Sequence, residues 1–358
     1  MEFGLNFFPS CGPEDKSAEA YWSDALHLCG LMDQLGYTHV RTVEHYFHPY
    51  GGYSPNPVVF LAAAAQRSAR AKMITGAVLP VFNNPLKVAG ELGMLDGIAQ
   101  GRAECGFARA FLPNEFETFG IPIDESRERY EEGVEQIRLL LSEENATHAG
   151  RFHSFENVTS LPRPVQTPHP PIWVAAMSSA ESFEFAGRNG FNIMGIPMGG
   201  GTMAELIGLY RETWRSAGHP GNGRVMLSFS MYVAEDGKAA RDAFRPPLNA
   251  YLERLVDAAS AWLEGASTKA YRNYDKMIAQ LKDDNFDAQL ERGICWTGTP
   301  DEVSDRIADY DRQLGGFEVA SLHVMPHVTP VDVAERSMRL FSEKVMPKFV
   351  NASQAAAE

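Results

Sequence analysis

Four side chains able to do chemistry crowd into five positions near the start of the chain. Residues 41–55 read RTVEHYFHPYGGYSP: a β-type run is followed by Glu44, His45, Tyr46 and His48, and then by glycine and proline. Carboxylates and imidazoles are common general acids and bases, and a histidine pKa near neutrality suits proton transfer. We therefore interpret His45 and Glu44 as candidate catalytic residues.

Two other interpretations of this stretch stay open. Glu44, His45 and His48 are ligand types that zinc accepts. The spacing E-H-x-x-H falls on a predicted strand and turn, however, whereas metal ligands at i and i+4 are aligned by a helix, so we expect no metal here. The remaining alternative is a histidine that only packs or caps.

A second group of residues indicates phosphate binding. Arg109 directly follows the run AECGFA, and Arg127 lies in the first turn of a helix that IDESRERYEE opens. Guanidinium groups grip phosphate through bidentate, charge-assisted hydrogen bonds. The segment VAAMSSAES places Met177, Ser178 and Ser179 where a strand becomes a helix, so its N–H groups and hydroxyls form an anion site. The alternative is that the arginines form surface ion pairs and Ser178 caps the helix.

Strand-like and helical patterns alternate along the chain, as in βα units around a parallel sheet. The strand-like runs are FGLNFF, HVRTVE, KMITGAVLP, AECGFA, PIWVAA, FNIMGI, VMLSFSMYVA and VASLHVMP. Eight such units close into a TIM (β/α)8 barrel, and an open doubly wound sheet is the competing architecture. In a barrel, the active site lies at the C-terminal ends of the strands, where both groups of candidate residues fall.

The expected barrel fills residues 1–350 as a single domain and leaves 351–358 as a flexible tail. Two polar stretches interrupt the alternation and are expected to be loop insertions, at about 143–170 and about 265–298. The second shows no clear strand. Long insertions of this kind usually serve as lids or mobile segments.

Composition excludes several classes of partner. The 46 acidic and 32 basic side chains give a formal charge of −14, which is the wrong sign for nucleic acid or anionic lipid. The N-terminus lacks a signal peptide, and no apolar run approaches the length of a membrane span, so we expect a cytoplasmic protein. The four cysteines are scattered without C-x-x-C spacing and are expected to be buried.

Taken in order, the motifs resemble the bacterial luciferase-like flavin-dependent monooxygenases, and the closing helix resembles that of the luciferase α chain. The resemblance is carried by MEFGLNFF, VEHYF, NPLKVAGELGMLDGIAQGRAECGFARAF, FETFGIPIDESRERYEE, PPIWVAAMSSAESFEFAGRNG, TGTPDEV and SMRLFSEKVMPKF. It implies a TIM barrel that receives reduced FMN from a separate flavin reductase. Such an enzyme adds O2 at flavin C4a and oxygenates a small apolar or aromatic organic substrate. A homodimer is also implied, with PVVFLAAAAQ and VAGELGML in the contact.

The resemblance assigns roles to individual residues. Arg109, Arg127 and Ser178 would hold the flavin phosphate beside Met177, and His45 would be the catalytic histidine. A non-proline cis peptide is implied within TGAV, residues 75–78, which makes Ala77 a predicted flavin contact.

Departures from the luciferase pattern argue against a long-chain aldehyde substrate and against light emission. They are Tyr46 for a second histidine, Ala108 for a reactive cysteine and Met177 for a glutamate. Two alternatives stay open: an F420-dependent oxidoreductase of the same fold, and a non-catalytic flavin-binding subunit that resembles the luciferase β chain.

Overall fold

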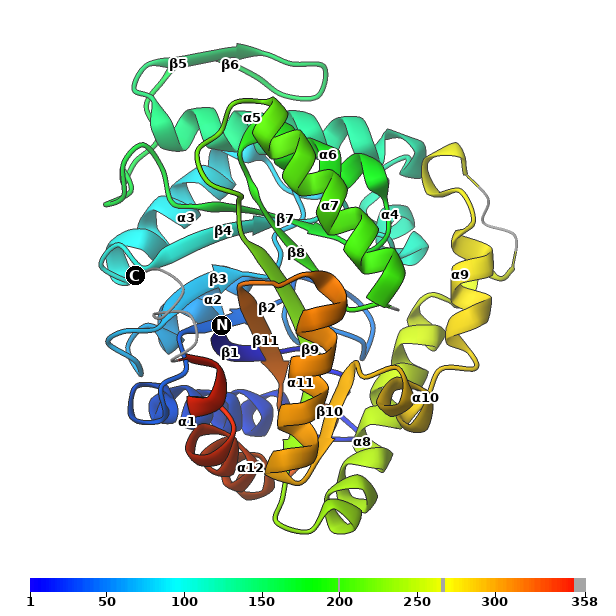
Figure 1. Ribbon diagram of the computed structural model, residues 1–358. Helices are drawn as coiled ribbons and strands as arrows, with labels where there is room; N and C mark the ends of the chain where they lie inside the picture. Colours follow the sequence, from blue (N-terminus) through cyan, green and yellow to red (C-terminus); the bar gives the residue numbers. More distant parts are fainter. Residues whose placement is uncertain (199, 265–267, 351–358) are drawn as a thin grey trace.

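The computed structural model describes residues 1–198, 200–264 and 268–350, and these form a closed parallel barrel surrounded by helices (Figure 1). The predicted flexible tail, 351–358, lies outside the described residues. The barrel strands run in the order β1 (Glu2–Phe7), β2 (His39–Thr42), β3 (Lys72–Thr75), β4 (Ala103–Phe107), β7 (Ile172–Ala176), β8 (Asn192–Gly195), β9 (Val225–Val233) and β11 (Val319–His323). The β11–β1 and β8–β9 pairings close the ring. These strands coincide with the eight predicted runs, so the TIM barrel prediction is confirmed.

Each barrel strand is followed by a helix that covers the outside of the sheet. These helices are α1 (Ala18–Leu35), α2 (Pro57–Ala64), α3 (Pro85–Ile98), α5 (Ser126–Ser142), α6 (Ala180–Asn189), α7 (Gly200–Ser216), α8 (Gly237–Ala258) and α12 (Val331–Lys344). Two Asn-Pro pairs define where α2 and α3 begin. The side chains of Asn56 and Asn84 accept hydrogen bonds from Val58 N–H and Leu86 N–H, both at 2.9 Å. The proline after each asparagine has the φ that a first helical residue needs.

The barrel interior is a packed core, because each strand is buried on both faces. Its lower part is filled by Ile74, Trp173, Met194, Met226 and Val319. The indole Nε1 of Trp173 donates to Oε2 of Glu104 at 2.6 Å, which satisfies two polar groups inside the sheet. Side chains thus fill this part of the interior, and the chemistry is expected at the strand ends.

The expectation that residues 265–298 contain no clear strand is wrong. The described part of this insertion holds a short 3-10 turn (Lys269–Tyr271), α9 (Tyr274–Leu281), α10 (Phe286–Glu291) and β10 (Cys295–Gly298). Strand β10 extends the sheet by pairing in parallel with the C-terminal half of β9, with Cys295 opposite Ser230. The indole of Trp296 stacks on the Phe229 ring at 3.8 Å. A four-residue strand is too short for a periodic pattern, and α11 (Pro300–Leu314) follows it at once.

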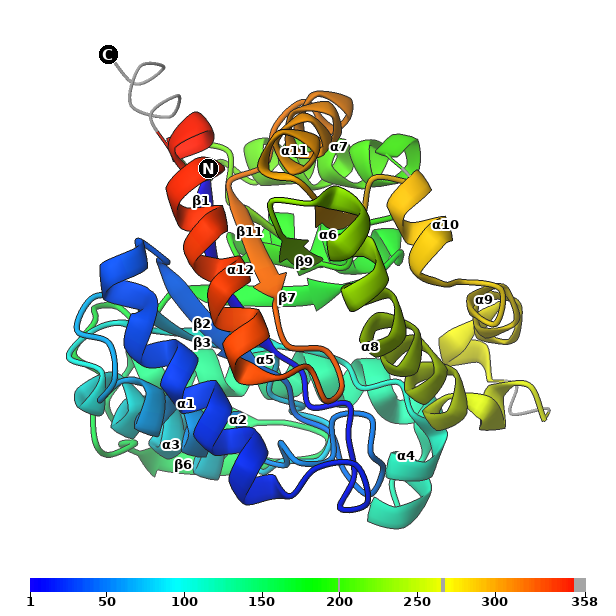
Figure 2. The same cartoon turned by 90° about the horizontal axis from the view of Figure 1, so that it is seen from below.

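Other elements were also absent from the predicted pattern. Residues 143–170 contain an antiparallel hairpin, β5 (Ala146–Ala149) with β6 (Ser154–Val158). Between β4 and α5 lie α4 (Pro113–Phe119) and a 3-10 turn (Ile123–Glu125). Figure 2 shows α4, α9 and the C-terminal part of α8 gathered on the side toward which the β7 arrow points. These pieces surround the mouth of the barrel.

The described residues contain neither a membrane-spanning helix nor a cluster of metal ligands. No helix in residues 1–198, 200–264 and 268–350 combines the length and apolarity needed to cross a bilayer. In the same ranges, no group of three or more His, Cys, Asp or Glu side chains is placed to hold a metal ion.

We expect the Trp296→Ala substitution to lower the free energy of unfolding by about 3 to 5 kcal/mol, because it removes a fully buried indole and leaves a cavity over Phe229. Urea unfolding of the purified protein measures this. Val350→Ala, at an exposed position, is the control and should stay within about 0.5 kcal/mol of wild type. Equal losses in the two variants would mean that β10 is not part of the cooperative core.

Candidate active site

His45 lies at the barrel mouth and is held by a carboxylate that the sequence did not single out. Strand β2 ends at Thr42, and three residues later the Nδ1 of His45 lies 3.0 Å from Oε1 of Glu115 in α4. The N–H of Tyr46 donates to the same oxygen at 2.9 Å, and the Glu115 side chain is fully buried. A carboxylate only accepts, so Nδ1 of a neutral His45 carries the hydrogen and Nε2 keeps its lone pair.

Aromatic rings enclose the imidazole of His45. The ring centroids of Phe8, Tyr50 and Phe111 lie 5.6, 5.4 and 6.0 Å from that of His45. The loop backbone also approaches closely: a Cβ at Gly51, where φ is +84°, would lie 2.6 Å from the His45 Cβ. Glycine is therefore required at position 51 both by the positive φ and by this close contact. An apolar enclosure of this kind limits access of water to His45.

Glu44 points to a different loop from His45. Its buried carboxylate accepts from Leu79 N–H at 3.0 Å, from the Asn83 amide at 2.7 Å and from the Tyr46 hydroxyl. Burial raises the pKa of Glu44 to about 7, although these hydrogen bonds act to lower it and the charge of Glu115 raises it further. Glu44 thus fixes the loop after β3, and no hydrogen bond in the described chain joins it to His45.

The predicted non-proline cis peptide is confirmed, between Gly76 and Ala77 at the end of β3. Ala77 is buried, and the Gly76 N–H donates to the Thr42 carbonyl at 2.8 Å across the β2–β3 edge. The Gly76–Ala77 segment therefore lies next to the loop that carries His45.

Arg109 and Arg127 come together at the same mouth. The Arg109 guanidinium lies 4.0 Å from the Tyr271 ring centroid and donates to the Ala270 carbonyl at 3.1 Å. Arg127 donates to the Ser179 hydroxyl at 3.4 Å and lies 3.9 Å from the Glu181 carboxylate. A hydrogen bond from Ser179 lowers the pKa of Glu181, and the positive charges of Arg127 and Arg109 act in the same direction.

The turn after β7 supplies the third part of this cluster. Ser179, not Ser178, occupies the N-cap position of α6, but its side chain makes no capping hydrogen bond and donates to the Glu181 carboxylate instead. Ser178 is exposed and Met177 is half-buried at this turn. Because Arg127 contacts Ser179, the turn and the Arg127 side chain face the same space.

The predicted site residues therefore all follow neighbouring strands of the barrel. The order β2-β3-β4-β7 carries in turn His45 with Glu44, then Ala77, then Arg109 with Arg127 of the next helix, and finally Met177 with Ser178. Glu115 and Tyr271 were missed. Glu115 stands 70 positions from His45 in the sequence, and nothing in the motif FLPNEFETF marks it as a partner.

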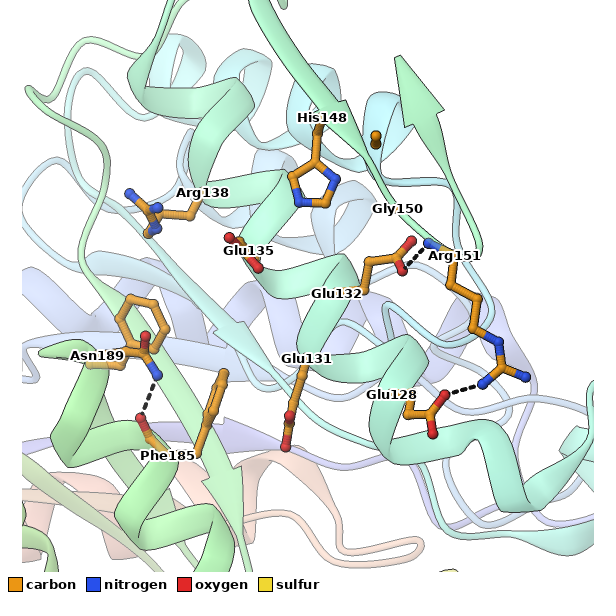
Figure 3. Close-up of a pocket in the computed structure, with 12 residues that line it drawn as sticks. Glu128, Glu131, Glu132, Glu135, Arg138, His148, Gly150, Arg151, Phe185 and Asn189 are labelled. Atoms are coloured by element: carbon orange, nitrogen blue, oxygen red, sulfur yellow. Dashed lines mark hydrogen bonds and ion pairs between the residues drawn. The ribbon is translucent and has the colours of Figure 1, made fainter.

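A cavity of about 540 Å³ lies away from this mouth, on the outside of the barrel between α5, the β5–β6 hairpin and α6 (Figure 3). Two of the acidic side chains that line it have structural partners. Glu132 accepts from the N–H groups of Arg151, Phe152 and His153 at 2.7 to 3.0 Å, and Glu128 pairs with the Arg151 guanidinium. These contacts anchor the hairpin to α5, so we do not assign this cavity as the active site.

Comparisons with known proteins identify the family of the chain. The profile described as "Luciferase-like monooxygenase" matches residues 1–316. The oxygenase component of flavin-dependent trigonelline monooxygenase from Acinetobacter baylyi is 27% identical over 360 residues, covering 98% of this chain and 96% of that protein. The crystal structure of monooxygenase RslO1 from Streptomyces bottropensis is 42% identical, with a TM-score of 0.88 and coverage of 98% and 100%.

A more distant structure shares the fold. The oxygenating constituent of 3,6-diketocamphane monooxygenase from Pseudomonas putida, in complex with FMN, is 23% identical, with a TM-score of 0.82 and coverage of 98% and 99%. The profile match extends over most of the sequence, from the first strand to the end of α11. The chain belongs to the luciferase-like monooxygenase family.

Proposed function

We propose that this protein is the oxygenase of a two-component flavin-dependent monooxygenase. It would take reduced FMN from a separate flavin reductase and use O2 to oxygenate a small apolar or aromatic organic substrate. The observation that carries the proposal is the buried His45–Glu115 pair at the same barrel mouth as the Arg109–Arg127 cluster. Family membership supports the same activity.

The residues present fit a flavin mononucleotide. Arg109, Arg127 and the turn with Met177 and Ser178 would hold the phosphate, since two guanidinium groups and helix-start N–H groups favour a dianion. In the structure, Arg127 also forms ion pairs with the Glu131 and Glu181 carboxylates, at 3.6 and 3.9 Å. Ala77 and the aromatic rings around His45 offer an apolar surface to the flavin ring. Bound reduced FMN would supply the electrons and the position at which O2 reacts.

In this proposal, the chain's own contribution is to hold a proton and exclude water. In its imidazolium form, His45 carries a second proton at Nε2, which it would donate to an oxygen atom of the reacting group. The Glu115 carboxylate, which accepts from Nδ1, stabilises this form. Phe8, Tyr50 and Phe111 shield that position from water. Glu44 keeps the loop after β3 in place rather than transferring the proton.

The two alternative functions make different demands on the site. A non-catalytic flavin-binding subunit needs the arginine cluster but has no use for a histidine held by a buried carboxylate, so the His45–Glu115 pair favours an enzyme. An F420-dependent oxidoreductase would use the same barrel without O2. Binding of reduced FMN against reduced F420 separates it from the proposed oxygenase.

We also propose a homodimer formed through α2 and α3. Val59 in α2 and Met94 in α3 are 69% and 57% exposed, and Leu86 in α3 is exposed as well. Large apolar side chains at this exposure on two helices adjacent in sequence indicate a partner surface. A second copy is the occupant we propose for these exposed side chains; the glycines of α3 are not part of this contact, since a Cβ at Gly93 would lie 2.2 Å from the Pro162 carbonyl oxygen of the same chain.

We expect Arg109→Ala to weaken the binding of reduced FMN by about 1.5 to 3 kcal/mol, the scale of a lost hydrogen bond to a charged group. Anaerobic calorimetry measures the affinity. The control is Arg312→Ala, which removes an exposed guanidinium from α11 and should leave the affinity unchanged. Equal affinity in wild type and Arg109→Ala would remove Arg109 from the phosphate site.

His45→Ala should keep the affinity for reduced FMN within a few-fold and lower product formation about a hundredfold, the usual scale for a lost general acid or base. Hydrogen peroxide should be released instead. Glu115→Gln should lower product formation in the same direction, because an amide does not stabilise the imidazolium. Product and peroxide are measured after a substrate screen by mass spectrometry, with His27→Ala in α1 as the control. Wild-type product formation in His45→Ala would make His45 a structural residue.

Introducing charge at the exposed apolar positions tests the dimer. Wild type should scatter light as twice 39.5 kDa, and the double substitution Val59→Asp with Met94→Glu should scatter as 39.5 kDa, because two buried charges would be unpaired. Val350→Asp is the matched control. A wild-type protein that stays at 39.5 kDa at all concentrations would contradict the dimer.

A further inference from the structure

A buried arginine lies inside the barrel without an acidic partner. Arg41 in β2 is 7% exposed; its Nη2 donates to the Ser228 hydroxyl in β9, and its Nη1 approaches the Met194 sulfur at 3.3 Å. The third guanidinium nitrogen, Nε, is buried and has no hydrogen-bond partner. Among the residues that the structure describes, no carboxylate lies within ion-pairing distance of this guanidinium. Burial lowers the pKa of Arg41 to about 10, so it stays charged at neutral pH.

More unsatisfied polar atoms lie on the same inner face. In β11, the Ser321 hydroxyl and the Nε2 of His323 are buried and have no partner. Ser321 is in register with Ser228, and parallel neighbours in register face the same side of the sheet. Burial lowers the pKa of His323 to about 3, and the charge of Arg41 lowers it further. The His323 ring is therefore neutral, and it lies within the electrostatic reach of Arg41.

This group of residues adjoins the chamber of His45. The stem of Arg41 packs under the end of β3, where a Cβ at Gly76 would lie 3.0 Å from the Arg41 Cδ. A run of aromatic contacts leads upward: Tyr251 lies 5.0 Å from His323, Phe8 lies 5.4 Å from Tyr251, and His45 lies 5.6 Å from Phe8. The arginine thus lies at the floor of the mouth, below the catalytic histidine.

We propose that Arg41, with Ser228, Ser321 and His323, forms an oxyanion pocket on the floor of the barrel mouth, and that it binds the carboxylate or phenolate of the organic substrate. The guanidinium presents a planar fork of donors that matches a carboxylate. An uncompensated buried charge destabilises a fold, and apolar replacements of buried ions are often neutral or stabilising. A function that needs the charge accounts for its presence. The identity of the ligand as substrate rests on the proposed oxygenase function.

Calorimetry on the flavin-free protein tests the pocket directly, with benzoate as the probe and benzamide as its neutral counterpart. Wild type should bind benzoate at least about tenfold tighter than benzamide, on the scale of hydrogen bonds to a charged group. Arg41→Met should lose this preference. Arg109→Ala should keep it, which excludes binding at the phosphate cluster, and Arg312→Met is the control for loss of an exposed charge.

A parallel titration with reduced FMN separates the two sources of negative charge. If wild type shows no benzoate preference but Arg41→Met binds reduced FMN at least about tenfold more weakly, the pocket stands and the reduced flavin ring occupies it. If neither ligand depends on Arg41, the pocket is overturned. Normal binding of reduced FMN with no dependence on Arg41 would leave the oxygenase function intact.

Thermal unfolding distinguishes a binding role from a structural one. Arg41→Met should unfold at or above the wild-type temperature, since it replaces an unpaired buried charge with an apolar side chain. A marked fall in unfolding temperature with unchanged benzoate preference would make Arg41 a structural residue and overturn the proposal. Should Arg41→Met not fold, Ser228→Ala removes one hydroxyl that contacts the guanidinium and undergoes the same titrations.

Discussion

The hydrogen bond between His45 and Glu115 joins two loops that leave the barrel from different strands. His45 follows β2 and Glu115 lies in α4 after β4, so their 3.0 Å contact spans the mouth and sets the position of both loops. The second hydrogen bond, from Tyr46 N–H to Glu115, prevents the carboxylate from turning away. Glu44, one residue before His45, fixes the loop after β3 in the same manner. Three consecutive strand ends are thereby held together by two buried carboxylates.

The mouth concentrates charged groups in an apolar setting, which is unfavourable for stability and useful for binding. Glu44 has a pKa raised to about 7 by burial, and Arg41 is buried with no acidic partner in the described chain. Apolar side chains at these positions would stabilise the fold more, because an isolated buried charge lowers the free energy of unfolding. Glu44 lies just past a strand end, whereas Arg41 contacts Met194, one of the apolar residues that fill the lower interior, so the charged groups begin where this apolar filling ends.

The barrel could be predicted because its strands are short, almost wholly apolar runs that alternate with helical patterns. The pieces that were missed are short: α4, β10 and the β5–β6 hairpin carry too few residues for a period to appear. Within the site, His45, Arg109 and Arg127 were singled out by their residue types at strand ends, whereas the cis peptide and the role of Ala77 followed from the resemblance alone. Glu115 and Arg41 could not be found in this way. One depends on a contact between residues 70 positions apart, and the other on burial that a strand sequence does not reveal.

The most direct measurement is a crystal structure of the protein with reduced FMN, prepared under anaerobic conditions. The account predicts the phosphate between Arg109, Arg127 and the turn at Ser178, and the flavin ring against Ala77 with the Nε2 of His45 facing it. Phosphate density elsewhere, such as in the cavity between α5 and α6, or a ring out of reach of His45, would contradict it.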